Sequence, residues 1–317
     1  MANESIGAQQ YLALVDESTW GTFPGTPTYY HVPVTEYGVE FQPVNRQAKP
    51  YLGIFSQKNN KNYKGMPSGN LNAPLYGWKP TGLSTSIAQC LLDWSFADPT
   101  SAFPRSKSAE WAIGPNVANK RHSGLRVNQA TLSGNEDSGE VDISLGLMGK
   151  SEVGNDIVTA AQTIPNSRNL AVSMEFADAT FALAGSAILL SSFQLSLSHG
   201  LKAKHLNSFT PSVLMKTQRV ITLNFKPILN SDTYEAYNRA TSMTEFTGQI
   251  VLKGLHNGTG TGGTNWTVCT IDFARLSFVK SAREGGIEDI LMNGIDMVAL
   301  KPDTSSQDVT FTFSEAA

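Results

Sequence analysis

Residues 140–147 read Glu-Val-Asp-Ile-Ser-Leu-Gly-Leu, and every second side chain in this stretch is apolar. Successive side chains of a β-strand point to opposite faces of the sheet. A period of two therefore places one face in a core and leaves the other toward water or a partner. A helix would need apolar residues at every third or fourth position instead. The stretch is predicted to be a half-buried β-strand.

The same alternation recurs along most of the chain, with apolar positions separated by polar residues or glycine. The repeats are Tyr37, Val39 and Phe41; Phe193, Leu195 and Leu197; Ile221, Leu223 and Phe225; Cys269, Ile271 and Phe273; and Val309, Phe311 and Phe313. Strands of this kind, half polar and half apolar, are typical of antiparallel sheets. The predicted fold class is therefore mostly β.

Helical periodicity is found in two short stretches. Ile87, Cys90, Leu91 and Trp94 fall on one face of a helix predicted over 83–94, which makes Cys90 a small core side chain. A second helix is predicted from Asp232, with the Glu three positions later as its capping-box partner, toward residue 243. We therefore expect a β protein with a few short helices.

Composition argues against several classes of protein. The 317 residues carry a formal net charge of −3 and only 16% charged residues, which disfavours a dedicated nucleic-acid binder or a polybasic membrane anchor. A hydrophobic content of 40% is too high for a disordered chain. The apolar runs are shorter than the ~20 residues of a membrane helix. The first residues resemble no secretion signal, and two cysteines fit a reducing compartment.

The length allows two domains of about 150 residues each, and the two halves of the chain can be aligned. A shift of 156 residues lays Tyr37 on Phe193, and a shift of 152 lays Leu71-Asn72 on Leu223-Asn224. Any two β segments can be aligned in this way, so the alignment alone is a hypothesis. It predicts a tandem duplication, with modules 1–160 and 161–317 and a linker around residues 154–169.

Charges are segregated within each half. No acidic residue occurs over 41–92 or over 179–231, although both stretches contain lysine and arginine, and acidic residues follow each stretch. Complementary patches of this kind favour self-association in a fixed orientation. The alternative is chance clustering of solvated surface charge.

We find no motif that predicts catalysis, a cofactor or a metal. Gly258–Gly263 matches G-x-G-x-x-G, but the residues that follow read as a strand rather than a helix, so a hairpin tip is favoured. The histidines lack the spacing that would place two of them on one metal ion. Glu140 and Asp142 could act as acid and base in principle, but they lie on the polar face of a predicted strand. We therefore predict no catalytic, cofactor-binding or metal-binding residues.

Residues 17–27 read Glu-Ser-Thr-Trp-Gly-Thr-Phe-Pro-Gly-Thr-Pro. This segment is similar to the opening of the family of tail tube (major tail) proteins of long-tailed bacteriophages. Ser68-Gly69-Asn70-Leu71, Ser138-Gly139-Glu140-Val141 and Gly149-Lys150 resemble its next landmarks. The resemblance is densest over residues 11–150.

The resemblance implies a β-sandwich or half-barrel with a flanking helix in each module. Copies would pair edge to edge into rings, and stacked rings would form a hollow tube that conducts phage DNA into the host. With two modules per chain, the implied ring is a trimer that is pseudo-hexameric, and a hexamer is the alternative. In such a tube we expect Glu36, Glu40, Glu140 and Asp142 to line the lumen, although the second-half positions Ser192, Ser196 and Ser198 are neutral.

Ring stacking is assigned by the same resemblance to a long basic loop that carries Lys58, Lys61, Tyr63 and Lys64. Its acidic acceptor would lie around Glu136 and Asp137 or around Glu288 and Asp289. The implied partners are a tape measure protein in the lumen and the tail terminator and tail tip proteins. DNA would pass without tight binding, and no cofactor or membrane anchor is implied.

The implied location is the virion tail, after assembly in the host cytoplasm. The alternatives are another virion β protein, such as a decoration protein, fibre or adhesin, and less favoured, a carbohydrate-binding module or an enzyme. In the latter case exposed tryptophans such as Trp78, Trp111 and Trp266 could stack on sugar rings.

Overall fold

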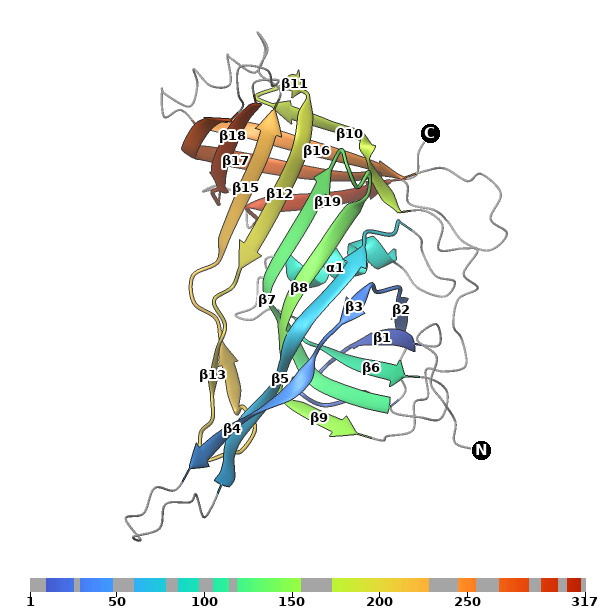
Figure 1. Ribbon diagram of the computed structural model, residues 1–317, viewed down its shortest axis with the longest axis vertical. Helices are drawn as coiled ribbons and strands as arrows, with labels where there is room; N and C mark the ends of the chain where they lie inside the picture. Colours follow the sequence, from blue (N-terminus) through green and yellow to red (C-terminus); the bar gives the residue numbers. More distant parts are fainter. Residues whose placement is uncertain are drawn as a thin grey trace, which may run out of the picture.

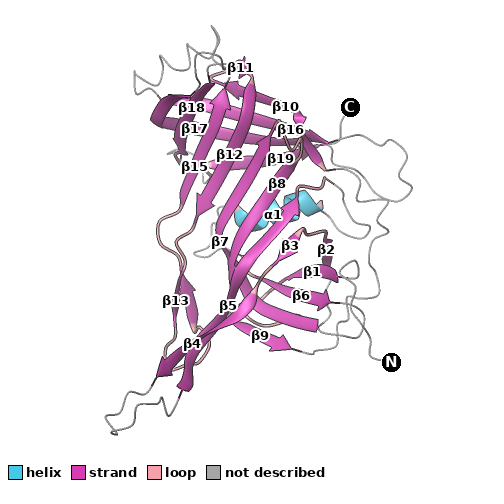
Figure 2. Cartoon of the chain, in the orientation of Figure 1, coloured by secondary structure: helices cyan, strands magenta, loops and turns pink. Residues whose placement is uncertain are grey.

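The computed structural model describes residues 10–25, 29–47, 60–77, 85–96, 105–113, 119–154, 173–227, 245–254, 268–284, 292–301 and 307–314. Strands dominate these residues, as Figure 2 shows, which confirms the mostly β prediction. In the first half the elements are β1 (Gln10–Asp16), β2 (Tyr30–Val32), β3 (Glu36–Tyr37), β4 (Glu40–Gln47), β5 (Asn60–Pro74), α1 (Ile87–Ser95), β6 (Lys107–Ile113), β7 (Asn119–Asn135), β8 (Val141–Met148) and β9 (Ser151–Gly154).

In the second half the strands are β10 (Met174–Leu183), β11 (Ser186–Ile188), β12 (Leu190–Ser198), β13 (Lys202–Lys204), β14 (Val213–Met215), β15 (Val220–Pro227), β16 (Phe246–Gly254), β17 (Val268–Glu284), β18 (Met292–Ala299) and β19 (Val309–Ser314). The predicted linker over 154–169 and the predicted helix over 232–243 lie almost entirely outside the described residues, as does the glycine-rich stretch 258–263.

The predicted alternation is confirmed in the burial of the strands. In β8, Val141, Ile143, Leu145 and Leu147 are buried, and the residues between them are exposed or half-buried. Phe193, Leu195 and Leu197 of β12 follow the same rule. Burial also alternates over residues 36–42, but the strand itself stops after Tyr37 and resumes at Glu40.

At this interruption between β3 and β4, the backbone comes very close to the backbone of β5, with which both strands pair. A Cβ atom on Gly69 would lie 2.1 Å from the carbonyl oxygen of Gly38. Only glycine, which has no Cβ, allows the two backbones to approach this closely. The alternation reports which side chains are buried, but it does not report this contact between backbones.

One long sheet runs through both halves of the chain, which Figure 1 shows from its broad side. Its strands follow the order β3 and β4, β5, β8, the second half of β7, β12, β15, β18 and the second half of β17. All of these pairs are antiparallel. The strands come from both halves of the sequence, and they share one continuous buried face.

Two smaller groups of strands continue from the ends of the two longest strands. The first half of β7 pairs with β6 and β9, and β6 continues through β1 to β2. The first half of β17 pairs with β16 and β19, and β16 continues through β10 to β11. Strands β7 and β17, each 17 residues long, therefore connect the long sheet to its smaller partners in the same way.

The helix α1 forms on the predicted apolar stripe, but it begins at Ile87, because Ser86 caps it, rather than at residue 83. The hydroxyl of Ser86 accepts a hydrogen bond from the backbone N–H of Gln89 at 3.1 Å, so Ser86 is the N-cap. All four predicted apolar positions are buried. The helix contacts β2, β7 and β19 and therefore closes part of the core between the sheets.

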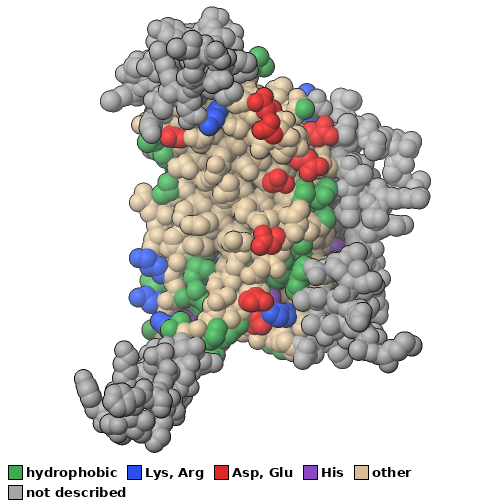
Figure 3. All heavy atoms as spheres, viewed as in Figure 1, with side chains coloured by type: hydrophobic (Ala, Val, Ile, Leu, Met, Phe, Trp, Pro, Cys, Tyr) green, Lys and Arg blue, Asp and Glu red, His purple; other side chains and the backbone are tan. Residues whose placement is uncertain are grey.

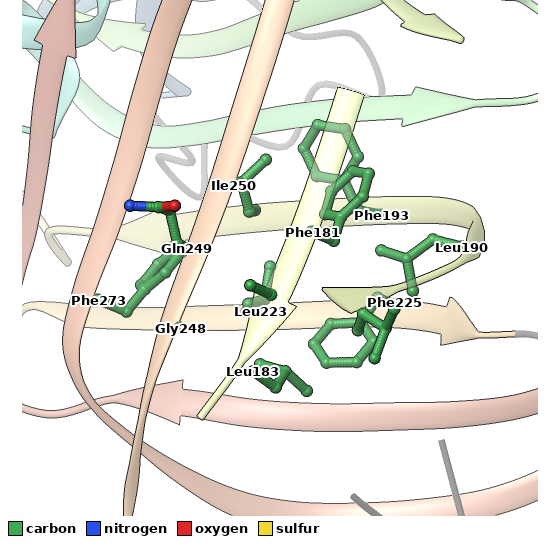
Figure 4. Close-up of a pocket in the computed structure, with 12 residues that line it drawn as sticks. Phe181, Leu183, Leu190, Phe193, Leu223, Phe225, Gly248, Gln249, Ile250 and Phe273 are labelled. Atoms are coloured by element: carbon green, nitrogen blue, oxygen red, sulfur yellow. The ribbon is translucent and has the colours of Figure 1, made fainter. Parts of the chain in front are cut away.

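The core is one continuous apolar cluster that extends through both halves. A pocket remains in the second half between β10, β12, β15 and β16, and Figure 4 shows its lining of Phe181, Phe193, Phe225, Phe273 and neighbouring aliphatic side chains. Among the described residues that line it, Gln249 and Gly248 are the ones that are not apolar. The pocket is thus a gap in core packing, without the group of polar side chains that a substrate site needs.

Candidate assembly surfaces

The exposed face of the long sheet carries all four acidic residues that the family resemblance assigns to a lumen. Glu36, Glu40, Glu140 and Asp142 are each exposed. Figure 3 shows this face as a broad area of uncharged polar side chains and backbone atoms, with acidic side chains scattered over it. The serines at 192 and 196 lie on the same sheet in β12 and are half-buried.

Two asparagines order this polar face. Asn72 of β5 pairs in register with Glu36 on one side and Ser144 on the other. Its amide donates to Oε2 of Glu36 at 2.7 Å and its Oδ1 accepts from the Ser144 hydroxyl at 2.6 Å. Asn224 of β15 pairs in register with residues 194 and 296 in the same manner.

Asp296 of β18 adds an acidic side chain that the sequence reasoning did not assign to this face. Asn224 donates to Oδ1 of Asp296. When Asn72 is matched with Asn224, Asp296 occupies the position opposite Asn224 that Ser144 occupies opposite Asn72. The signal was present in the sequence, because Ile295, Met297 and Ala299 alternate with Asp296 and residue 298.

The two halves of the long sheet meet at a ladder between β7 and β12, which we call the seam. It extends from the Asn135–Ser192 pair to the Gln129–Ser198 pair. Leu132 and Leu195 form its centre and are fully buried. The N–H of His199 adds one more bond, to the carbonyl of Asn128 at 2.8 Å.

The long sheet has two unpaired edges in the described part of the chain. Strand β4 pairs only with β5, and from Ser277 onward β17 pairs only with β18. Strand edges with free N–H and C=O groups are templates for another strand. Strand β4 occupies the place of β12 in the first half, and β17 occupies the place of β7 in the second. The free edges are thus the equivalents of the two strands that form the seam.

The residues assigned to ring stacking are only partly within the described structure. Lys64 is half-buried in β5, and Lys61 and Tyr63 belong to the same strand. Lys58 lies outside the described residues. Glu136 and Asp137 are exposed in the turn after β7, whereas Glu288 and Asp289 lie outside. The β4–β5 hairpin lies at the opposite end of the long axis from β10 and β11 (Figure 1).

A second projecting hairpin, β13–β14, was not predicted from the sequence. It lies beside the β4–β5 hairpin, where the rings of Phe41 and Phe209 stack with centroids 5.7 Å apart. The N–H of Gly65 donates to the carbonyl of Phe209 at 3.0 Å. Lys202 and Lys204 of this hairpin are exposed, and so are Leu206, Phe209 and Met215.

The segment with the family-like opening motif fixes the bend of β7. Glu17 accepts the backbone N–H of Gly124 at 2.7 Å and of Gly21 at 2.8 Å. Nε1 of Trp20 donates to the carbonyl of Gly124 at 2.9 Å. Gly124, with φ +70°, lies where β7 passes from the small group of strands to the long sheet. The motif therefore ties the segment after β1 to the point where β7 passes between the two groups of strands.

A buried polar network connects β3, β7 and β9. The Tyr37 hydroxyl lies 2.8 Å from Nδ1 of His122, and Nε2 of His122 lies 3.1 Å from Oε2 of Glu152. Burial lowers the pKa of His122 and raises the pKa of Tyr37 well above its usual value. His122 has no exposed surface, so this arrangement of tyrosine, histidine and carboxylate braces the sheets rather than facing a substrate.

Within the described ranges, no three His, Cys, Asp or Glu side chains are grouped to hold a metal ion. Cys90 and Cys269 are buried, and burial raises the pKa of both thiols. As far as the chain is described, no helix is long and apolar enough to cross a membrane.

Comparison with protein families matches residues 7–313 to the family described as "Phage tail tube protein". The match covers both halves of the chain, including the seam and both free edges. Comparison with curated proteins gives no match.

Proposed function

Because the chain belongs to the phage tail tube protein family and is therefore a structural component of the phage tail, we propose that its copies close into rings that stack into the DNA-conducting tube. The family is structural rather than enzymatic. The observation that carries the proposal is the seam, which joins β7 and β12 as two neighbouring subunits would be joined.

We propose that the chain contains two tandem tube modules, residues 1–160 and 161–317. The supporting observation is the order of strand pairing. β2–β1–β6–β7 is matched by β11–β10–β16–β17, and β4–β5–β8–β7 is matched by β12–β15–β18–β17. In this interpretation the seam is an interface between modules within one chain.

Ring closure follows if the free edges repeat the seam between chains. Aligning Asn72 with Asn224 also aligns Glu40 of β4 with Ser198 of β12. The same alignment matches Gly146 with residue 298, and it therefore matches their pairing partners, Gln129 and Ser277. Because Gln129 and Ser198 are direct partners at the seam, Ser277 of one chain would face Glu40 of the next. Three chains would then supply six modules, and a ring of six chains is the alternative that an end-on view distinguishes.

The polar face of the long sheet would line the lumen in such a ring. Its acidic side chains repel the phosphates of DNA, and its serine, threonine and asparagine side chains offer no positive charge that would hold them. DNA would then pass without tight binding. The tape measure protein would occupy the lumen before ejection, and the tail terminator and tip proteins would cap the two ends.

Stacking of rings would use the basic hairpin end of one ring and the acidic end of the next. Lys58, Lys61 and Lys64 belong to the first end, together with the exposed lysines of β13. Glu136 and Asp137 belong to the second, and Glu288 and Asp289 are the other proposed acceptor. The subunits would assemble in the host cytoplasm and remain in the virion tail.

A disulfide trap tests the ring. The variant Glu40→Cys with Ser277→Cys should form covalent closed trimers when assembled tubes are oxidised. The matched control, Gln129→Cys with Ser198→Cys, places the same pair across the seam and should cross-link within one chain whether or not tubes form. The native cysteines are buried and should not interfere. A chain that stays small and monodisperse at high concentration in electron micrographs, with no cross-link between chains, would overturn the proposal.

A further inference from the structure

The free edge of β17 carries one extra residue. The ladder between β17 and β18 shifts register between Phe278 and Lys280, so Val279 has no partner in β18. An unpaired residue of this kind is a β-bulge, which bends a strand and interrupts its ladder. The side chain of Val279 is 65% exposed, whereas Phe278 packs against the core. The bulge therefore presents an apolar side chain at an edge that is open to a partner.

Strand β7, which occupies the place of β17 in the first half, has no extra residue at this point. In the same alignment of the two halves, Phe278 corresponds to Ala130. Lys280 corresponds to Thr131, which directly follows Ala130 in the chain. The register shift of β7 against β8 lies elsewhere, over residues 127–129. The bulge is therefore a feature of the free edge and not of the matching strand at the seam.

The free edge at the other end of the sheet also departs from its counterpart at the seam. Strand β12 is continuous, whereas β3 ends at Tyr37 and β4 begins at Glu40. The two residues of this interruption, Gly38 and Val39, correspond to residues 196–197 of β12. The interruption is therefore also specific to the free edge.

Repeating the seam between two chains brings these two irregular places together. The seam pairs residues 130–131 with residues 196–197. The corresponding pairing between chains places the two neighbours of Val279 opposite Gly38 and Val39. The two free edges therefore depart from the seam strands at one and the same position of the proposed interface.

Gly38 leaves room at this position. It is exposed and lies on the same face as Glu36 and Glu40. A Cβ atom on Gly38 would lie 3.8 Å from Oε1 of Glu36 and 3.9 Å from the carbonyl oxygen of Asn70, which are ordinary contact distances. Its φ lies outside the left-handed region that favours glycine. Packing among the described residues of one chain therefore does not require a glycine here.

We propose that Val279 of one copy packs over Gly38 of the next, and that this contact selects the register in which the two free edges join. This inference rests on the proposed ring. A strand that slips by two residues still buries its apolar side chains, so alternation alone does not reject that slip. The slip would, however, move Val279 from Gly38 to Glu36 or Glu40. Each glutamate fills the space that the glycine leaves open, so both slipped registers are disfavoured.

Exchanging bulk between the two edges tests the contact. The readout is the yield of cross-links between chains when tubes that carry Glu40→Cys and Ser277→Cys are oxidised. Gly38→Val should lower this yield about tenfold, because the new side chain would occupy the place of Val279. Adding Val279→Gly to the same chain should restore the yield, since the double variant moves the side chain from one edge to the other. A purely structural effect of Gly38→Val within its own chain would not be rescued in this way.

A second disulfide trap reads the register. Gln42→Cys with Ser277→Cys reports a slip of two residues along the same exposed face. With Gly38 and Val279 both present, only the Glu40→Cys pair should cross-link between chains. In Gly38→Val the ratio of slipped to proposed cross-link should rise about tenfold, because the proposed register loses its fit.

Two controls keep this test decisive. Gly146 lies in β8, away from both free edges, and a Cβ atom there would lie 3.6 Å from Cβ of Gln129, which is again an ordinary contact. Gly146→Val should therefore leave the cross-links between chains unchanged. The Gln129→Cys with Ser198→Cys pair within the chain should still cross-link in Gly38→Val, which shows that the fold is intact.

The outcomes separate the inference from the ring itself. Normal yield and register in Gly38→Val overturn the contact between Val279 and Gly38 and leave the ring standing. A reduced yield that Val279→Gly does not restore overturns the contact as well, because the loss then has another source. No cross-link between chains in any background overturns the proposed ring, and the inference with it.

Discussion

Leu132 of β7 and Leu195 of β12 face each other across an antiparallel ladder that joins the two halves of the chain. Both side chains are fully buried, and they lie 63 positions apart in the sequence. Leu132 belongs to the first half of the chain and Leu195 to the second. It is therefore the point at which the chain already contains the contact that we propose between subunits.

Loss of packing at this contact should destabilise the fold. Leu195→Ala should lower the free energy of unfolding by about 2–5 kcal/mol, because it removes buried methyl groups and leaves a cavity. The measurement is equilibrium urea denaturation. Gln194→Ala, next to it on the exposed face, should change stability by less than about 0.5 kcal/mol. Equal effects of the two substitutions would contradict the buried seam.

Two glycines with the same backbone conformation should differ in how well they tolerate a side chain. Gly139 has φ +69° and open space around it, so Gly139→Ala should cost about 1 kcal/mol through backbone strain alone. A Cβ at Gly124 would lie 2.8 Å from Nε1 of Trp20 and from Cβ of Lys150. Gly124→Ala should therefore cost at least about 1 kcal/mol more, measured by thermal and urea unfolding of both variants. A difference near zero would contradict the bend at β7.

Positive charge on the polar face should make DNA bind to assembled tubes. The variant with Asn70, Gln129 and Gln194 changed to Lys adds charge to the face that carries Glu36, Glu40, Glu140 and Asp142. DNA should be retained at low salt and released as salt rises, as expected for phosphate contacts. The measurement is DNA retention by purified tubes across a salt series. The same number of lysines at Thr247, Thr310 and Thr312, which are exposed on the smaller group of strands, should produce no retention inside the tube.

Charge reversal at the basic end should interfere with ring stacking. Changing Lys58, Lys61 and Lys64 to Glu should give fewer rings per tube without unfolding the subunit, because like charges would meet between rings. Tube length in electron micrographs measures the effect. Adding Glu136→Lys and Asp137→Lys to the same chain should restore length, and Lys253→Glu, at an exposed position in β16, is the control. Tubes of normal length from the triple reversal would reject these lysines as the stacking residues.

Stability should fall as the pH is lowered from 7 toward 5. Burial lowers the pKa of His122 in the folded state below its ordinary value of about 6.5. The unfolded chain therefore binds a proton that the folded chain resists, and the free energy of unfolding decreases as pH falls through that range. Burial also lowers the pKa of His31, so this residue changes stability with pH in the same direction. His122→Gln should flatten the dependence of the urea midpoint on pH, and an unchanged slope would show that His122 is not its source.

Alternation in the sequence predicted several of the strands, among them β8, β12 and β15, and their buried faces, because burial of one face requires a period of two. The helix α1 followed from its apolar stripe, whereas its capping serine was identified only in the structure. Residues 17–27 and the later short motifs pointed to the family that the comparison then matched over nearly the whole chain. Each of these signals is local, since it depends on side chains close together in the sequence.

Pairing across the sheet was decided only by the tertiary structure. The sequence shift of 156 laid Tyr37 on Phe193, whereas matching the partners Leu71 and Leu223 aligns Tyr37 with Leu195, two residues further on. Registers that differ by two bury the same face, so alternation cannot distinguish them. The choice depends on backbone hydrogen bonds between distant strands, and so do the seam and the free edges. The sequence alone therefore determined what is buried, and the tertiary structure determined which strand edges remain open to a partner.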